Sequence, residues 1–275
     1  PSNISNWNTS KGTSMKAMFS LNDSFNQDIS TKQVTIAAGT PLEKTYNAWD
    51  VSNVILFGST IAGRFYEGIF FNSDFNQDIS NWQINTGSDI NMNGMFSAAY
   101  KFNQPITGST VTVGSNTYEA WNTKKVTNFR YTFYNPYYVS STMSFAQPIG
   151  EWDVSSSTDM TSMFQYNENF NQDLSKWNTS NVTNMGAMFR STNMQHALSS
   201  SYQNHPTRGE YIAWDTSNVT NMSFMFQNNL SYKIATSGYN QDINNWNISQ
   251  VTDMSGMFSG DSNTISSFNQ DISTK

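Results

Sequence analysis

The chain has 275 residues, and its eight Trp, thirteen Tyr and nineteen Phe provide ample apolar material for a core. Only 12% of the residues are charged, which excludes a charge-rich disordered chain. The formal net charge of −6 is spread without a basic run, and this argues against a nucleic-acid partner.

Two classes of element are also excluded from this stretch of sequence. No segment approaches the run of about eighteen or more apolar residues that a membrane-spanning helix requires. The sequence contains no Cys, so it forms no disulfide and no thiolate site.

The sequence is a tandem repeat with a period of about 25 residues. One copy runs from Phe170 to Phe189 and reads FNQDLSKWNTSNVTNMGAMF. Twelve of the fourteen Met lie in six M-x-x-M-F words, and the two units that lack the word carry aromatic residues and Ile in its place. The Trp residues that mark the units are Trp7, Trp49, Trp82, Trp121, Trp152, Trp177, Trp214 and Trp246.

Each unit combines two spacings of apolar residues. Trp82 and Ile84 are two residues apart, so they share one face of an extended segment. Val182, Met185 and Met188 are three apart, which suits a helical turn or a short helix. We therefore predict, in each unit, a short strand at the Trp, a bend, a short helix or irregular turn at the Met word, and a return loop.

One such unit cannot bury its own apolar face, whereas stacked units can. We predict a single solenoid domain over residues 1–275, with about eight repeats and a continuous core of Trp, Met, Phe and Ile. The Asn of the F-N-Q-D word is expected to form a ladder that satisfies backbone groups of the loops. Its members are Asn26, Asn76, Asn103, Asn171, Asn240 and Asn269.

Three coils carry insertions, at about residues 31–47, 107–119 and 196–212, and each insertion ends in Tyr-x-Ala-Trp. Val111–Tyr118 alternates in polarity around a Gly-Ser-Asn turn, which predicts a β-hairpin, and the other two insertions are expected to be hairpin-like. Insertions at one register emerge on one side of a solenoid, often the binding side. Both ends of the sequence cut through a repeat, so we expect a segment of a longer array.

The repeat resembles the BspA-like class of leucine-rich repeats, through the pattern W-[DN]-[VT]-S-x-V-T-[DN]-M-x-x-M-F and the word F-N-Q-D-I-S. Such repeats occur in bacterial surface proteins and in mycoplasma-type surface lipoproteins. The resemblance implies a solenoid with one short strand per coil on the concave face and short helices or irregular turns on the convex face. It also implies surface display, a role in adhesion, and no catalytic residue. The three insertions depart from the pattern, and neither a lipobox cysteine nor a wall anchor is present.

The residues that flank each Trp are expected to face outward if the Trp faces inward. These include the Ala before Trp49, Trp121 and Trp214, and a polar column one residue after each Trp. The column could hydrogen-bond glycans or partner loops, or hold a hard cation such as Ca²⁺. Its alternative role is a solvated ladder that discourages aggregation, favoured because no aromatic platform interrupts it. The column consists of Asn8, Asp50, Gln83, Asn122, Asp153, Asn178, Asp215 and Asn247.

The sequence offers little for catalysis. Its two histidines, His196 and His205, both lie in the third insertion region, and no metal or phosphate motif accompanies them. We therefore predict a non-enzyme with no cofactor. Asn occurs 36 times and charge is scarce, a composition that favours an extracellular protein. The expected partners are a host or neighbouring-cell protein or glycan, or other copies of the chain. The alternative is a structural array that assembles into a filament, sheath or spacer.

Overall fold

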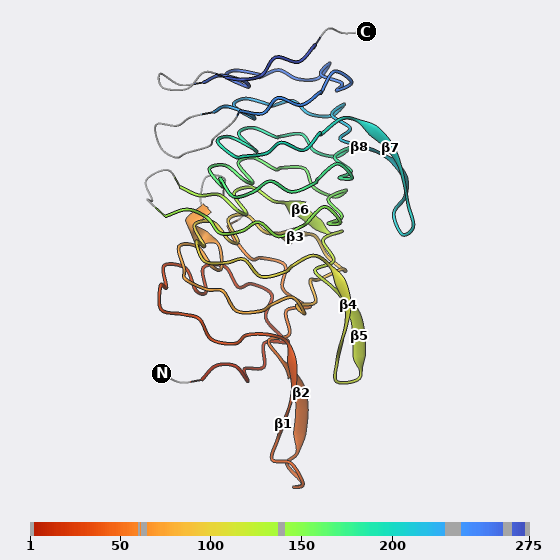
Figure 1. Cartoon of the computed structure of the whole chain (residues 1–275). Coiled ribbons are helices and arrows are strands. Elements are labelled where there is room, and N and C mark those ends of the chain that lie inside the picture. The colour runs from red at the N-terminus through yellow and green to blue at the C-terminus, as the bar shows by residue number, and fades with distance from the viewer. Residues whose placement is uncertain are drawn as a thin grey trace.

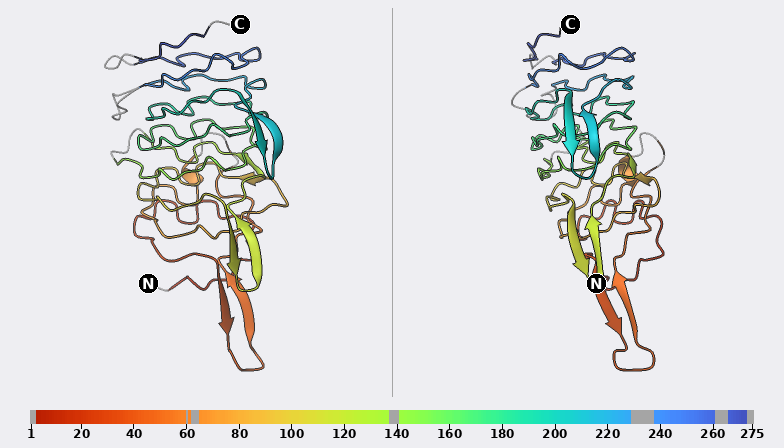
Figure 2. Two further views of the ribbon diagram at one scale, coloured as in Figure 1. Left: turned by 45° about the vertical axis from the view of Figure 1, so that its right-hand side comes forward. Right: turned by 90° about the vertical axis from the view of Figure 1, so that its right-hand side faces the viewer.

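The chain winds into coils that are stacked along one axis, from the N-terminal to the C-terminal end (Figure 1). The computed structural model describes residues 3–59, 61, 65–136, 141–228, 238–260 and 266–272. Three hairpins leave the stack along one edge and point toward its N-terminal end, as the rotated views also show (Figure 2). In the described residues no helix is long and apolar enough to cross a membrane.

The three insertions predicted from the sequence are antiparallel hairpins, which confirms that prediction. The first hairpin pairs β1 with β2, the second β4 with β5, and the third β7 with β8. A short parallel pair, β3 with β6, joins two coils. The strands are β1 Lys32–Ile36, β2 Lys44–Ala48, β3 Ile90–Asn91, β4 Ser109–Val113, β5 Asn116–Ala120, β6 Val126–Asn128, β7 Ser201–His205 and β8 Gly209–Ala213, and the described residues contain one 3-10 helix, η1 Phe65–Glu67.

The coils are joined by parallel bridges just before the Met words, not at the Trp residues. Asp159 bridges Asn128 on one side and Asn184 on the other, and the ladder continues through Asn221 to Asp253. The prediction of a strand at each Trp is therefore wrong. The backbone turns there, because the N–H of each Trp bonds to a carbonyl three residues earlier or, after a hairpin, to the Trp of the preceding coil.

Each M-x-x-M word forms a tight turn, which is the second of the two alternatives expected for this segment. The N–H of Met188 donates to the carbonyl of Met185 at 3.1 Å, and Ala187 between them has a φ of 54°. A residue in this left-handed conformation cannot continue an α-helix. The N–H of Ala187 instead bonds to the carbonyl of Ser223 in the next coil, at 2.7 Å.

Aromatic rings stack through the interior from coil to coil. Trp121 and Trp152 are parallel within 2°, with ring centroids 6.1 Å apart. A second ladder is formed by the Phe that ends each Met word, as in Phe164 and Phe189 at 5.6 Å. The buried apolar side chains form one contiguous cluster from Met15 to Met257. This cluster supports the predicted core of Trp, Met, Phe and Ile.

The buried Trp residues also tie neighbouring coils together by hydrogen bonds. The Nε1–H of Trp152 donates to the carbonyl of Ile106 at 2.6 Å, and that of Trp177 donates to the carbonyl of Ile149 at 3.1 Å. The same bond recurs at each Trp from the second coil onward. A buried indole N–H requires such an acceptor, and an Ile or Leu carbonyl of the preceding coil supplies it.

The predicted Asn ladder is confirmed. The Oδ1 of Asn26 accepts the N–H of Asn76 at 2.9 Å, and the Oδ1 of Asn76 accepts that of Asn103 at 3.0 Å. Asn103 in turn accepts the N–H of Ala146 at 3.0 Å. The side chain of Ala146 has no oxygen that could accept a hydrogen bond, so the ladder is interrupted there. It resumes at Asn171, whose Oδ1 accepts the N–H of Gln195.

Candidate binding surface

The polar column lies partly exposed along the stack, but its oxygens are engaged in turns. In seven of its eight members Oδ1 accepts the backbone N–H two residues on, at 2.9–3.2 Å, which makes each an Asx turn. Gln83 has a longer side chain and is the exception. The seven are Asn8, Asp50, Asn122, Asp153, Asn178, Asp215 and Asn247.

The backbone of the column is engaged as well. The hydroxyl of Thr123 donates to the carbonyl of Asp153 at 3.0 Å, and that of Thr179 donates to the carbonyl of Asp215 at 2.8 Å. Each of these Thr residues lies two positions after a Trp, and it points inward as the sequence predicts. The column therefore closes one corner of each coil and joins it to the next. This geometry supports the structural interpretation of the column over the ligand-binding one.

The column contains no two carboxylates in successive coils. Asp50, Asp153 and Asp215 each have an amide residue before and after them in the column. Over the part of the chain that the structure describes, no group of three or more His, Cys, Asp or Glu residues is placed to hold a metal ion. The arrangement thus lacks the clustered carboxylates that a Ca²⁺ site ordinarily uses.

The alanines that precede three of the Trp residues do not face outward, and that prediction is wrong. Ala48, Ala120 and Ala213 are fully buried. Each ends the second strand of a hairpin, and the Trp that follows has a φ near 50°. This left-handed residue breaks the alternation of an extended chain, so that the Ala and the Trp both point into the core.

All three hairpins are anchored by the same tyrosine, the first residue of Tyr-x-Ala-Trp. The hydroxyl of Tyr46 donates to the carbonyl of Asn6 at 2.7 Å, and that of Tyr118 donates to the carbonyl of Asn81 at 2.6 Å. Tyr211 makes the equivalent bond to Lys176 at 2.7 Å. Each acceptor directly precedes the Trp of the preceding coil, so every hairpin folds back over that coil.

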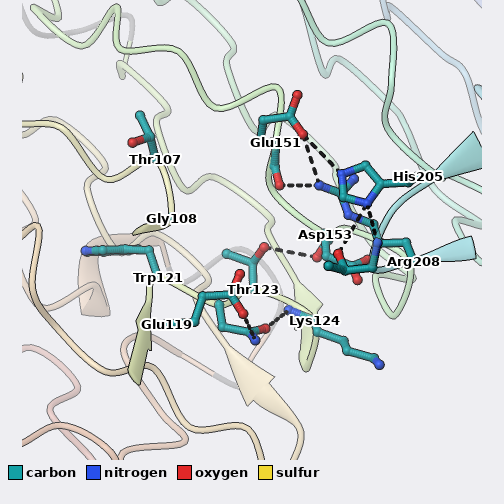
Figure 3. A pocket seen from close by; sticks show the side chains of 12 residues that line it. Thr107, Gly108, Glu119, Trp121, Thr123, Lys124, Glu151, Asp153, His205 and Arg208 are labelled. Carbon is teal, nitrogen blue, oxygen red and sulfur yellow. Dashed lines mark hydrogen bonds and ion pairs between the residues drawn. The ribbon is translucent and has the colours of Figure 1, made fainter. Parts of the chain in front are cut away.

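The tip of the third hairpin is also held by a cluster of charged side chains around Glu151 (Figure 3). The carboxylate of Glu151 lies 2.8 Å from Lys176 Nζ, 3.3 Å from His205 Nε2 and 3.5 Å from Arg208 Nη2. The hydrogen bond from Lys176, with further help from His205 and the charge of Arg208, lowers the pKa of Glu151 below its ordinary value. Sequence reasoning did not identify this cluster, because Arg208 and Glu151 are 57 residues apart and no motif links them.

Glu151→Gln is expected to loosen the tip of the third hairpin without unfolding the stack. The side chains of Glu151 and Lys176 are more than half exposed, so the loss should be about 1 kcal/mol or less, seen as faster amide hydrogen exchange in residues 201–213. Because folding lowers the pKa of Glu151, its contribution is present above about pH 4.3 and is lost as the pH falls further. The difference in thermal stability between wild type and variant should therefore shrink toward pH 3.

Glu210→Gln is the control, because Glu210 lies on the same hairpin and outside the cluster. It should leave the exchange of residues 201–213 at neutral pH unchanged. Equal protection in wild type and Glu151→Gln would show that the cluster does not hold the hairpin.

A comparison with known families gives a match along the whole chain. The profile of the family described as Mycoplasma protein of unknown function, DUF285, matches four overlapping segments, residues 1–59, 36–118, 107–208 and 197–275, which together cover the chain. No curated protein and no solved structure matches it. The successive matches accord with the tandem repeat and with the stacked coils. The chain therefore belongs to this Mycoplasma repeat family of unknown function.

Proposed function

We propose that the chain is a non-catalytic recognition module of an extracellular surface protein and contributes to adhesion. Its stack of coils would be a solenoid of the BspA-like leucine-rich-repeat type, and the edge with the hairpins would contact a protein or a glycan on another cell. The observation that carries the proposal is the uniform anchoring of three hairpins along one edge by Tyr46, Tyr118 and Tyr211. Loops held on a rigid scaffold are a common way to present binding residues.

The outer face of the third hairpin supports a recognition role. Tyr202 and Ile212 lie directly opposite each other across β7 and β8, and their side chains are 66% and 51% exposed. Leu42, in the turn of the first hairpin, is 75% exposed. Tyr is enriched in protein interfaces, whose buried centres are more apolar than the rest of a protein surface.

A catalytic role has less support. His205 is engaged with Glu151 and Thr207 at the tip of the third hairpin, and the stacked core leaves little room for a buried catalytic group. The polar column has no two carboxylates in successive coils, and its Asp residues use their oxygens in turns. We infer that the chain acts by binding alone, without a cofactor.

The test is binding of the fluorescently labelled 275-residue chain to animal and bacterial cells, measured by flow cytometry. We expect saturable binding that weakens at least tenfold in a Tyr202→Ser, Ile212→Ser double variant. A Thr35→Ser, Thr45→Ser double variant, on the exposed face of the first hairpin, is the control and should bind as wild type does. Binding that excess chelator abolishes would indicate a cation-dependent adhesin.

Two results would contradict the proposal. The first is a chain that remains monomeric and binds none of the cells. The second is ordered, concentration-dependent self-assembly without cell binding, measured by light scattering and electron microscopy. That second result would favour the alternative of a filament, sheath or spacer.

A further inference from the structure

A recess lies between the second and third hairpins, and the spacing of the insertions explains it. One coil without a hairpin, that of Trp82, separates the first two hairpins, whereas two such coils, those of Trp152 and Trp177, separate the second from the third. The recess consists of two adjoining hollows of about 400 and 420 Å³. Each hollow falls within the range of about 300–1,000 Å³ that is typical of small-molecule sites.

Two positions in the lining of the second hollow lack the polar side chains that the repeat word usually carries. The repeat word normally has Asp and Ser two residues apart, as in Asp173 and Ser175, but the Trp152 coil has Pro148 and Gly150 instead. Both of these residues line the second hollow, together with Gly108 at the base of the second hairpin. A Cβ at position 150 would lie 2.4 Å from the carbonyl oxygen of Asp173, so the neighbouring coil packs directly against this glycine.

The wall between the hollows is Glu151, which lines both of them. Its carboxylate is fixed by Lys176, His205 and Arg208, as described above. The third hairpin therefore contributes its tip to the first hollow, while the second hairpin contributes its base (Figure 3). The recess therefore lies on the plain coils, between hairpins from two distant parts of the chain.

The first hollow is lined mainly by polar surface, and the two hollows together are nearly balanced in charge. The two hollows contain three cationic side chains, those of Lys124, Lys176 and Arg208, and four carboxylates. These carboxylates belong to Glu119, Glu151, Asp153 and Asp173. The lining also contains the amides of Asn122 and Gln172, of which Asn122 is fixed in place, because its Oδ1 accepts the N–H of Lys124 at 3.1 Å and its Nδ2 donates to Glu119 Oε2 at 2.7 Å. Such a lining favours a polar ligand without a large net charge.

We propose that this recess binds a neutral carbohydrate through hydrogen bonds to its hydroxyl groups, a proposal that rests on the recognition role inferred above. Each hydroxyl both donates and accepts a hydrogen bond, which matches a lining of interspersed carboxylates, amides and cations. Protein partners commonly bind through buried aromatic anchors. The one large aromatic residue of the lining, Trp121, is 1% exposed and packs in the core, so it offers no such anchor.

The test uses the intact chain on an array of neutral and acidic glycans, with a peptide array in parallel, followed by calorimetric titration of the glycans that bind. Thr107→Arg places a large side chain where the two hollows meet, since Thr107 lines both. Glu119→Ala removes an acceptor from the first hollow. Thr112→Arg, on the exposed outer face of the second hairpin, is the matched control.

We expect binding of at least one neutral glycan, weakened at least tenfold by Thr107→Arg and by Glu119→Ala and unchanged by Thr112→Arg. Thermal unfolding of each variant establishes that it is folded, and Glu119→Ala decides if Thr107→Arg does not fold. Equal affinity in the folded recess variants, binding of acidic glycans or peptides only, or no binding on either array would overturn the proposal. Cell binding that persists in Thr107→Arg would overturn only the assignment of the binding site to the recess. Failure of the wild-type chain to bind any cell would overturn the recognition role.

Discussion

Replacing Trp177 by alanine is expected to lower the free energy of unfolding by about 3–5 kcal/mol. The indole is fully buried and lies 6.3 Å from the ring of Phe164. Its removal would leave a cavity in the core and break the hydrogen bond that the Nε1–H donates to the carbonyl of Ile149. Because each coil is supported by its neighbours, the loss should appear as a lower denaturant midpoint for the whole stack, measured by circular dichroism.

Two variants separate the contributions at this position. Trp177→Phe keeps an aromatic ring but loses the hydrogen bond, so it should lower the free energy of unfolding by less than Trp177→Ala does.

Asn178→Ala changes the adjacent residue of the polar column. A side chain fully exposed to solvent would cost under about 0.5 kcal/mol, but the Oδ1 of Asn178 accepts the N–H of Ser180 at 3.2 Å. We therefore expect about 1 kcal/mol. Similar costs for Trp177→Ala and Asn178→Ala would mean that the core is assigned wrongly.

The parts of the fold that could be predicted are those with a repeated sequence signal. Trp177 and Met185 recur at fixed positions in unit after unit, and residues that do so must occupy equivalent places in a stack. Asn103 recurs in the same way, which made its role in a backbone ladder predictable. The hairpins were predictable because their apolar residues alternate around a turn, as in Val111–Tyr118.

The position of the strand and the conformation of the Met word could not be obtained from the same signal. A spacing of three between Met185 and Met188 fits a helical turn and a tight turn equally well. The deciding feature is the positive φ of Ala187, a residue type that gives no hint of a left-handed conformation. That conformation is stabilised by the neighbouring coil, whose Ser223 carbonyl accepts the N–H of Ala187.

The candidate site was predictable only in part. The polar column was selected from alternation alone, although Asn178 is followed two residues later by Ser180, a spacing typical of Asx turns. That spacing could have identified the structural role of the column. The cluster around Glu151 and the recess beside it depend on where the third hairpin folds, and no local pattern encodes such a long-range contact.

Gly58→Ala is expected to destabilise the chain by about 3 kcal/mol or more, at the upper end of the range for overpacked cores. A Cβ at this position would lie 1.6 Å from the carbonyl oxygen of Asn93 and 2.7 Å from its carbon. These are backbone atoms of the next coil, so no side-chain rotation can relieve the overlap. The two coils would have to separate, which would strain the bond from the N–H of Phe57 to the carbonyl of Asn91, now 2.9 Å.

Gly87→Ala is the matched control, because the nearest atom to its added Cβ is the Oδ1 of Asn85 at 3.6 Å, an ordinary contact distance. It should change the free energy of unfolding by less than about 0.5 kcal/mol in urea titrations. If Gly58→Ala were as stable as Gly87→Ala, the coils could not be in direct backbone contact at Asn93. The two coils would then not be tightly stacked at this point in the chain, and the rigidity of the hairpin-bearing edge depends on that stacking.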